Sequence, residues 1–584
     1  MIQNQTPTFR YKILPLLTVR ETVYLRVLGE ILIKPDWWIK LKDESITTKW
    51  RQEIRVALHQ LIATSGYAAP DPLPASKESS YTIKHVTDGE FVDHAVEFMF
   101  QELAFLSTEL IHKNDAIITP TSSHGVFLSD SIIKRDIVDR LTHHAASLEA
   151  DSLKRNDWHE GSDRKVLNLI HPSNYCVVFG KSLRRDNQQV LIGSAPIQTT
   201  LKKKSRVWGP DQNDISTSYQ WLPAEFHVSH EKEVTITSYI NNLNRRSHPE
   251  MYGIIAEVFQ QMIPMFELAL GSFETDHVDR MNASRSNCAY QAGDRWEWQT
   301  ESWIHHKFGP HADVKDPKLR NNQGFEEEYY QYLNNIGKRP TSIPGLPNDF
   351  NWEDVDTIDT FELHGRTVKV IVKMASIHLT PEKPTYKGGS WHLEGMENEA
   401  IAATGILYYS MDNITSSRLT FRHVQERDDF HCDQDDYGGL EHVFGFQNQT
   451  TDNVAITGQI EARENLCVVF PNFLHHKVED FELADKTSFG HRKILVFFLV
   501  HPDFGVLSSK NVAMQQMDWV ARDLYLDVFQ HRLPLEVVRR IVEFTGSTMT
   551  AQEAVKVAHE VMEERKNTPE GGYANIQQLN LCEH

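Results

Sequence analysis

Cysteine is scarce in this chain of 584 residues. The five that occur are scattered and form no CxxC pair: Cys176, Cys288, Cys432, Cys467 and Cys582. An odd number of scattered cysteines without CxxC spacing predicts neither a disulfide framework nor a zinc finger. Such cysteine usage is typical of a protein in a reducing compartment. We therefore expect a cytoplasmic protein, with the nucleus as the alternative.

Long apolar runs and a surplus of basic residues are also missing. No stretch of 18 consecutive apolar residues occurs, and residues 1–19 lack the apolar core of a signal peptide. The formal net charge is −20 at pH 7, whereas nucleic acids and anionic membranes attract basic surfaces. We expect no membrane partner and no general nucleic-acid binding.

The remaining composition is that of a globular protein, with 40% hydrophobic and 24% charged residues. Apolar residues at helical spacing predict a mostly helical N-terminal region over residues 1–155. Strand patterns dominate residues 156–525, interrupted by an irregular insertion near 272–350 that is a candidate for substrate specificity. Residues 526–584 are expected to form C-terminal helices and a tail.

A histidine and a glutamate two positions apart stand in the most informative segment, residues 388–395. They follow a Gly-rich turn, and apolar runs at 367–379 and 401–409 flank the segment. Residues i and i+2 of a strand point to the same face. His392 and Glu394 therefore supply two ligands of a 2-His-1-carboxylate iron site, which needs one more histidine.

The third ligand is expected in a later strand, where His475 and His476 follow an apolar strand and a Pro471-Asn472 turn. Neighbouring strand residues face opposite sides, so only one of the two histidines can point inward. Two positions beyond His476 stands the apolar Val478, which favours His476, although His475 stays open.

A cation for a cosubstrate follows in the sequence. Iron oxygenases that use 2-oxoglutarate hold its distal carboxylate with a cation, and arginine does so through two hydrogen bonds. Arg492 begins the apolar strand 492–500, directly after the strand of the paired histidines. We therefore expect Arg492 to bind the cosubstrate.

Phrases in the same order along residues 20–565 resemble the fungal family catalogued as domain of unknown function 4246. In that family the position before the distal histidine is usually glutamine, so the resemblance implies His476 as the ligand. It implies no reaction. The matching phrases lie at residues 34–38, 157–162, 170–173, 220–223, 238–243, 389–395, 470–472 and 490–493.

The Trp-His-x-Glu motif with a distant histidine is also similar, more remotely, to Jumonji-C-type oxygenases. That similarity implies a double-stranded β-helix of the jelly-roll or cupin-like kind, with Fe(II), 2-oxoglutarate and dioxygen. It implies Asn398 as a further contact to the cosubstrate. It also leaves the cosubstrate cation open, with Arg418, Arg422 and Tyr408 as alternatives to Arg492.

The sequence thus predicts an α+β protein whose double-stranded β-helix core carries helical additions at both ends. Its predicted activity is that of an Fe(II)/2-oxoglutarate-dependent dioxygenase that oxidises an unidentified small metabolite or protein side chain. His392, Glu394 and His476 would hold the iron. Two alternatives stay open: a non-catalytic binding or scaffold protein, and a cupin-like metalloenzyme that does not use 2-oxoglutarate.

Overall fold

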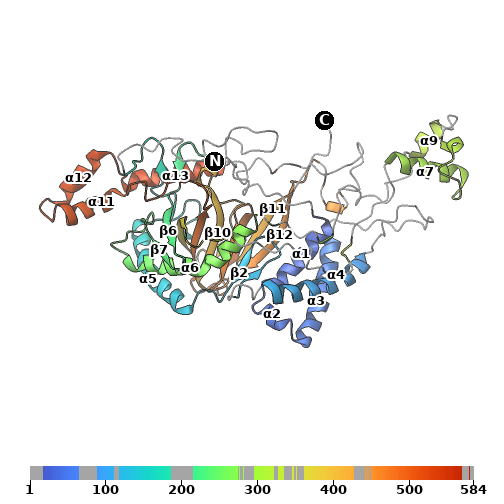
Figure 1. Cartoon of the computed structure of the whole chain (residues 1–584), viewed down its shortest axis with the longest axis horizontal. Coiled ribbons are helices and arrows are strands. Elements are labelled where there is room, and N and C mark those ends of the chain that lie inside the picture. The colour runs from blue at the N-terminus through green and yellow to red at the C-terminus, as the bar shows by residue number, and fades with distance from the viewer. Residues whose placement is uncertain are drawn as a thin grey trace.

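The computed structural model describes most of the chain, and the fold below refers to those residues. They are residues 17–64, 88–110, 117–185, 215–273, 295–320, 326–333, 361–425 and 449–567, with a few shorter pieces between them. Within them helices and antiparallel sheets combine in an α+β architecture, with the sheets at the centre (Figure 1).

A large antiparallel sheet forms the centre of the molecule. Its order is β1-β2-β13-β10-β16-β8-β6-β7, and β3 pairs with β8. Its longest strands are rich in β-branched and aliphatic residues, which favour extended backbone. The strands are β1 (Thr119–Pro120), β2 (Phe127–Ser129), β3 (Val166–Ile170), β6 (Ala224–Val228), β7 (Val234–Ile236), β8 (Thr367–Leu379), β10 (Ile401–Asp412), β13 (Cys467–Pro471) and β16 (Gly490–Val500).

A smaller sheet has the order β12-β11-β14 and is also antiparallel. Two short strand pairs, β15 with β9 and β4 with β5, complete the described strands. The bounds are β4 (Val177–Val178), β5 (Tyr219–Gln220), β9 (Thr385–Tyr386), β11 (Arg418–Val424), β12 (Val454–Glu461), β14 (His475–Val478) and β15 (Phe481–Glu482).

The two sheets face each other across one hydrophobic core. Phe498 of β16 and Phe470 of β13 pack there with Leu419 and Phe421 of β11. Because side chains alternate along a strand, the neighbours of these residues point to the opposite faces. We call the space between the sheets the interior.

Two helices cover the other face of the large sheet, α5 (Arg135–Arg155) and α6 (Pro249–Gly271). Gly405 of β10 permits the close approach of α6, since a Cβ there would lie 2.5 Å from the ring of Phe266. Among the described helices, α6 alone is long and apolar enough to cross a membrane. Its burial against the sheet accounts for that composition.

Further helices surround the sheets. The N-terminal helices form their own core, and α1 lies against β12 (Figure 1). The C-terminal α13 packs into the interior core through Val557 and Val561. The bounds are α1 (Val19–Leu32), α2 (Trp37–Lys40), α3 (Glu44–Thr64), α4 (Asp88–Phe105), α7 (Arg295–Phe308), α8 (Pro317–Arg320), α9 (Glu326–Leu333), α11 (Met517–Asp523), α12 (Leu535–Thr545) and α13 (Ala551–Asn567).

The sequence-based element boundaries hold in the β-rich part and shift near the N-terminus. The run 367–379 is β8, and the run 401–409 lies within β10. However, β1, β2 and α5 all precede residue 156 and yet belong to the large sheet and its cover, so a boundary at 155 divides elements that pack together. The insertion near 272–350 contains α7, α8 and α9, and much of the rest lies outside the described residues.

A buried carboxylate joins α5 to the large sheet. Glu149 lies 2.9 Å from Nε2 of His378 on β8 and accepts a hydrogen bond of 2.8 Å from Lys493 on β16. Burial would raise the pKa of Glu149, but the contacts with His378 and Lys493 outweigh it and lower the pKa from 4.5 to about 2. Because the pKa of Glu149 is lowered, its contacts with His378 and Lys493 stabilise the fold above pH 4.5. This stabilisation is lost as the pH falls toward 2 and the carboxylate is protonated.

Glu149→Gln is therefore expected to lower the free energy of unfolding by about 2–3 kcal/mol at pH 7. The difference from wild type should narrow as the pH falls from 4.5 toward 2. Urea unfolding at several pH values measures both effects. The matched control is Glu257→Gln, which removes an exposed ion pair with Arg140 between α5 and α6 and should cost under about 1 kcal/mol. Equal costs for the two variants would contradict the role of Glu149.

Candidate metal centre

The segment that carries His392 and Glu394 runs beside β14 without forming a long strand. His392 makes two backbone hydrogen bonds with His476, of 3.2 and 3.1 Å. Gly388, with a φ of +82°, brings the chain to β14, because a Cβ there would lie 2.7 Å from the carbonyl oxygen of Val478. The Gly-rich turn thus positions the first histidine next to the second.

The register of β14 decides which of the paired histidines faces the interior. His476 pairs with Phe421 of β11, whereas His475 pairs with Arg422. Phe421 belongs to the interior core, and directly paired residues share a face of the sheet. The structure therefore turns His476 to the interior and His475 to the opposite face.

Three ligand atoms converge in the interior. Oε1 of Glu394 lies 3.6 Å from Nε2 of His392 and 3.5 Å from Nε2 of His476, and the three ligand atoms lie within 4.8 Å of one another. Two atoms that bind one ion at about 2.1 Å can be at most about 4.2 Å apart. The spacing of the carboxylate to each imidazole therefore fits a shared metal ion.

Hydrogen bonds set the tautomers of both histidines. Nδ1 of His392 lies 2.9 Å from the carbonyl oxygen of Ser390, and Nδ1 of His476 lies 3.4 Å from that of Leu474. A carbonyl oxygen only accepts, so each Nδ1 carries the proton. This leaves the lone pair of each Nε2 directed toward Glu394, as metal-binding histidines require.

The three ligands differ in charge and exposure. Burial would raise the pKa of Glu394, but the neighbouring imidazoles of His392 and His476 lower it well below its usual value. Burial lowers the pKa of His392, and the adjoining Glu394 raises it more. Burial and His392 lower the pKa of His476. The side chain of His392 is 45% exposed and that of His476 only 4%, so the site opens on the side of His392.

Asn472 fixes the backbone of the carboxylate ligand. Its Oδ1 accepts a hydrogen bond of 2.9 Å from the N–H of Glu394, and its Nδ2 donates to the carbonyls of Glu394 and Ile401 at 2.8 and 3.0 Å. Asn472 is fully buried. The sequence analysis assigned this residue only to a turn, and its position directly after an apolar strand was the available signal.

Arg492 lies in the interior at the start of β16. It shares its face of the strand with Phe498, and its guanidinium carbon lies 5.2 Å from the ring centroid of Tyr408 and 5.7 Å from that of Phe481. Nη1 donates a 2.8 Å hydrogen bond to Ser417, but Nε is buried and donates to no described residue. Arg492 is thus a buried cation with no carboxylate partner among the described residues.

The other residues predicted to bind the cosubstrate lie at different places in the structure. Tyr408 lies beside Arg492 in the interior. Arg422 shares the face of His475 and lies over the ring of Trp391 at 4.6 Å, so it points away from the metal centre. Arg418 pairs with Glu30 of α1 at 3.0 Å.

Asn398 has a structural position. Its Oδ1 accepts from the N–H of Ser216 at 3.2 Å, and its Nδ2 donates to the carbonyl of Tyr219 at 3.0 Å. Both ends of the amide are occupied by the backbone of another segment. We therefore correct the expectation for Asn398 and Arg422, because neither offers a free donor to the interior beside the metal ligands.

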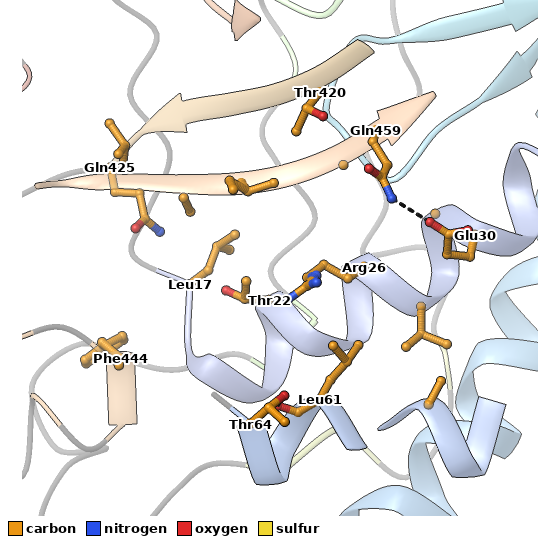
Figure 2. A pocket seen from close by; sticks show the side chains of 18 of the residues that line it. Leu17, Thr22, Arg26, Glu30, Leu61, Thr64, Thr420, Gln425, Phe444 and Gln459 are labelled. Carbon is orange, nitrogen blue, oxygen red and sulfur yellow. Dashed lines mark hydrogen bonds between the residues drawn. The ribbon is translucent and has the colours of Figure 1, made fainter. Parts of the chain in front are cut away.

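A large cavity lies elsewhere. It has a volume of about 1010 Å³ and is bordered by α1, α3 and the small sheet (Figure 2). Thr420 lines it, and Thr420 points to the face of β11 opposite to Phe421. The cavity is therefore separated from the metal ligands by the small sheet.

His476→Gln is expected to lower the affinity for a divalent metal by about 100-fold or more. Removing a group that only hydrogen-bonds to a metal ligand already lowers metal affinity by about 10–100-fold, and His476 is itself a proposed ligand. His475→Gln is the matched control, and its affinity should stay within about threefold of wild type because His475 faces away. Asn472→Ala should fall between them, at about 10–100-fold. Titration of the metal-free protein with Mn(II) or Zn(II) measures all three. A larger loss for His475→Gln than for His476→Gln would assign the wrong histidine.

Comparisons with solved structures give only weak similarities. IDO from Bacillus thuringiensis is 11% identical with a TM-score of 0.15, over 23% of this chain and 47% of that chain. The Fe(II)/(alpha)ketoglutarate-dependent dioxygenase TqaL is 14% identical with a TM-score of 0.16, over 26% and 52%. Oxalate decarboxylase from Bacillus subtilis is 12% identical with a TM-score of 0.11, over 42% and 52%. The chain matches about half the length of each structure, and such low scores assign no function.

Family comparison is more informative. No curated protein matches the chain. The family described as "Protein of unknown function (DUF4246)" matches residues 93–523, and its N-terminal domain, "Domain of unknown function DUF4246, N-terminal", matches residues 3–53. These matches cover most of the chain, including all three candidate metal ligands, and confirm the resemblance found in the sequence. The chain belongs to the DUF4246 family.

Proposed function

We propose that this protein is an Fe(II)- and 2-oxoglutarate-dependent dioxygenase. The observation that carries the proposal is the convergence of two imidazole Nε2 atoms and one carboxylate oxygen, from His392, His476 and Glu394. Two neutral histidines and one carboxylate form the donor set of non-haem iron oxygenases, which leaves positions open for other ligands. The opening on the side of His392 provides access to them.

The strand order supports a double-stranded β-helix as the scaffold. From β8 onward, successive segments alternate between the sheets: β8 is in the large sheet, and the His392 segment is bridged to the small one. The chain returns to the large sheet in β10 and passes through β11 and β12 of the small sheet. It then alternates through β13, β14 and β16. In this order the segments of His392 and His476 belong to the side of the small sheet, whereas Arg492 belongs to the large sheet, which supports the proposed arrangement.

Arg492 supports 2-oxoglutarate as the cosubstrate. A buried N–H without an acceptor costs about 1–3 kcal/mol, so the free Nε of Arg492 favours a ligand that supplies one. The distal carboxylate of 2-oxoglutarate is such a ligand. Tyr408 and Phe481 flank the guanidinium and hold it in the interior.

The chain's own residues provide binding, orientation and exclusion of water. His392, Glu394 and His476 would hold the metal, and Asn472 would keep Glu394 in place through hydrogen bonds to its backbone. Phe421 and Phe470 contact the ring of His476 and keep water from its inner side. When bound, iron, 2-oxoglutarate and dioxygen supply oxidative chemistry that yields succinate, carbon dioxide and an oxidised substrate. The substrate is a small metabolite or a protein side chain, and the reducing cytoplasm or nucleus suits a ferrous enzyme.

The metal-loaded protein is expected to bind 2-oxoglutarate and to form succinate slowly without any substrate. Arg492→Met should weaken 2-oxoglutarate by about 10–100-fold, because a charged hydrogen bond contributes about 1.5–3 kcal/mol. Calorimetry with Mn(II) and 2-oxoglutarate measures binding, and succinate release with Fe(II) and ascorbate measures turnover. His475→Gln serves as the control that retains both.

Two results would contradict the proposal. A protein that binds metal but shows no affinity for 2-oxoglutarate would be a metalloenzyme of another kind. A protein that binds no metal would be a scaffold, with the three ligands serving only the fold.

A further inference from the structure

Three hydrogen-bond donors gather beside the metal centre that neither bind the metal nor contact Arg492. They are Lys373 of β8, His171 after β3 and Arg565 near the end of α13. We call them the donor cluster. They come from segments far apart in the sequence, and the sequence analysis assigned none of them to the site.

Lys373 is a cation in the interior. It lies on the same face of β8 as Ile371, whose side chain belongs to the interior core, whereas the neighbouring Val372 faces α6. No described residue lies within hydrogen-bond or ion-pair distance of its ammonium group. Lys369 lies on the same face and pairs in register with Glu225 of β6, whereas the half-buried Lys373 has no described carboxylate at ion-pair distance.

His171 lies across from Lys373. The antiparallel pairing of β3 with β8 ends at Ile170 and Met374, and one further step sets His171 opposite Lys373. Nδ1 of His171 accepts a hydrogen bond of 3.3 Å from the N–H of Ser173. The neutral ring therefore carries its proton on Nε2 and is a donor there.

Arg565 completes the cluster from the C-terminal helix. Its guanidinium carbon lies 3.7 Å from the ring centroid of Trp221, and Nε1 of that ring donates to Ser173 at 3.1 Å. Nη2 pairs with the buried Glu399 at 2.6 Å. Nε and Nη1 are buried and donate to no described residue.

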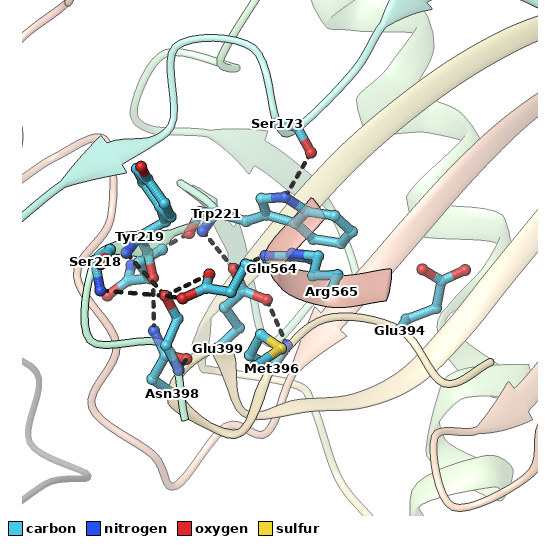
Figure 3. Close-up of polar contacts among 12 residues, drawn as sticks. Ser173, Ser218, Tyr219, Trp221, Glu394, Met396, Asn398, Glu399, Glu564 and Arg565 are labelled. Atoms are coloured by element: carbon cyan, nitrogen blue, oxygen red, sulfur yellow. Dashed lines mark hydrogen bonds and ion pairs between the residues drawn. The ribbon is translucent and has the colours of Figure 1, made fainter. Parts of the chain in front are cut away.

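The cluster adjoins the metal ligands. Glu399, the partner of Arg565, follows Glu394 on one loop, and its Oε2 accepts from the N–H of Met396 at 2.7 Å. Figure 3 shows Arg565 over Trp221, with Glu399 on one side and Glu394 on the other. Burial and the charges of Lys373, His159 and Arg565 lower the pKa of His171 well below its usual value, and Glu394 opposes them. His171 is thus the group on which the charges of Lys373, Arg565 and Glu394 all act.

We infer that the substrate carries an anionic, acceptor-only group, a carboxylate or a phosphate, which is bound by Lys373, His171 and Arg565. Every free polar atom of the cluster is a donor, and two of its members are cations. A neutral or cationic substrate group would leave these cations without an anionic partner, which would weaken substrate binding. The inference deepens the proposed function and rests on it for the term substrate, although the anion site itself can be tested separately.

The cluster is distinct from the cosubstrate cation. Arg492 pairs with Ile377, which is four residues from Lys373 on the same face of β8. At about 3.3 Å per residue, the two positions are about 13 Å apart along the strand. Arg492 lies beside the last residues of β8, whereas Lys373 lies at the middle of that strand. One anion can therefore bind at each position.

The test uses full-length protein loaded with Zn(II) and 2-oxoglutarate, so that the metal and cosubstrate positions are filled. It is titrated with acetate, inorganic phosphate and the neutral acetamide, and binding is followed by saturation-transfer NMR. Acetate or phosphate should bind and acetamide should not. Whichever anion binds more tightly identifies the source of the negative charge.

Three variants locate the binding. Lys373→Met removes a cation that has no described partner, and Arg565→Lys keeps the charge beside Glu399 while losing Nε and Nη1. Each is expected to weaken the anion at least tenfold. Lys477→Met is the matched control, because Lys477 lies over Trp391 on the outward face of β14, and its anion affinity should equal that of wild type. Circular dichroism and the thermal midpoint verify that each variant is folded.

The outcomes are separable. Equal affinity in wild type and in both cluster variants overturns the inference, as does binding of acetamide as tight as that of acetate. A loss of 2-oxoglutarate affinity in Lys373→Met, without loss of acetate, would reassign Lys373 to the cosubstrate and also overturn it. If 2-oxoglutarate does not bind at all, the same titration with Zn(II) alone still decides whether the anion site exists.

Discussion

The two backbone hydrogen bonds between His392 and His476 are the constraint on which the metal centre depends. They tie the segment before β10 to the start of β14 and set two imidazoles with ring centroids 4.4 Å apart. Asn472 adds a second tie to Glu394, across 78 residues of sequence. All of these bonds use backbone groups, so the ligand side chains are left free for an ion. A metal ion bound by the three side chains would add a further cross-link between these segments.

Cations without a carboxylate partner are a second feature of the interior. The chain has more acidic than basic residues, with a net charge of −20. Carboxylates are therefore numerous enough to pair with every buried cation. The buried Arg492 and the half-buried Lys373 nevertheless have no carboxylate at ion-pair distance among the described residues, and two nitrogens of Arg565 have no hydrogen-bond acceptor there. Burying a cation without an anion is unfavourable. A bound anion would supply the missing negative charge, as we propose for the cosubstrate and for the substrate.

Much of the scaffold could be predicted from the sequence because its signals are local. The apolar runs that became β8, β10 and β16 follow from strand periodicity. His392 and Glu394, in contrast, lie outside any strand, and only an isolated bridge joins His392 to His476. The boundary near residue 155 was less successful, since β1 and β2 reach the large sheet through pairing with distant β13. Such pairing depends on long-range contacts that a single sequence does not encode in its local pattern.

For the candidate site, the sequence by itself determined the residue types and their order: a histidine and a glutamate two positions apart, a later pair of histidines, and an arginine at the start of an apolar strand. Only the tertiary structure decided which of His475 and His476, and which of Arg492 and Arg422, faces the interior, because a shift of one residue in register turns a side chain to the other face. It also decided the role of Asn472 and brought Lys373, His171 and Arg565 together. Each of these stands alone in the sequence, and their shared location arises only when β3, β8 and α13 pack around the same end of the interior.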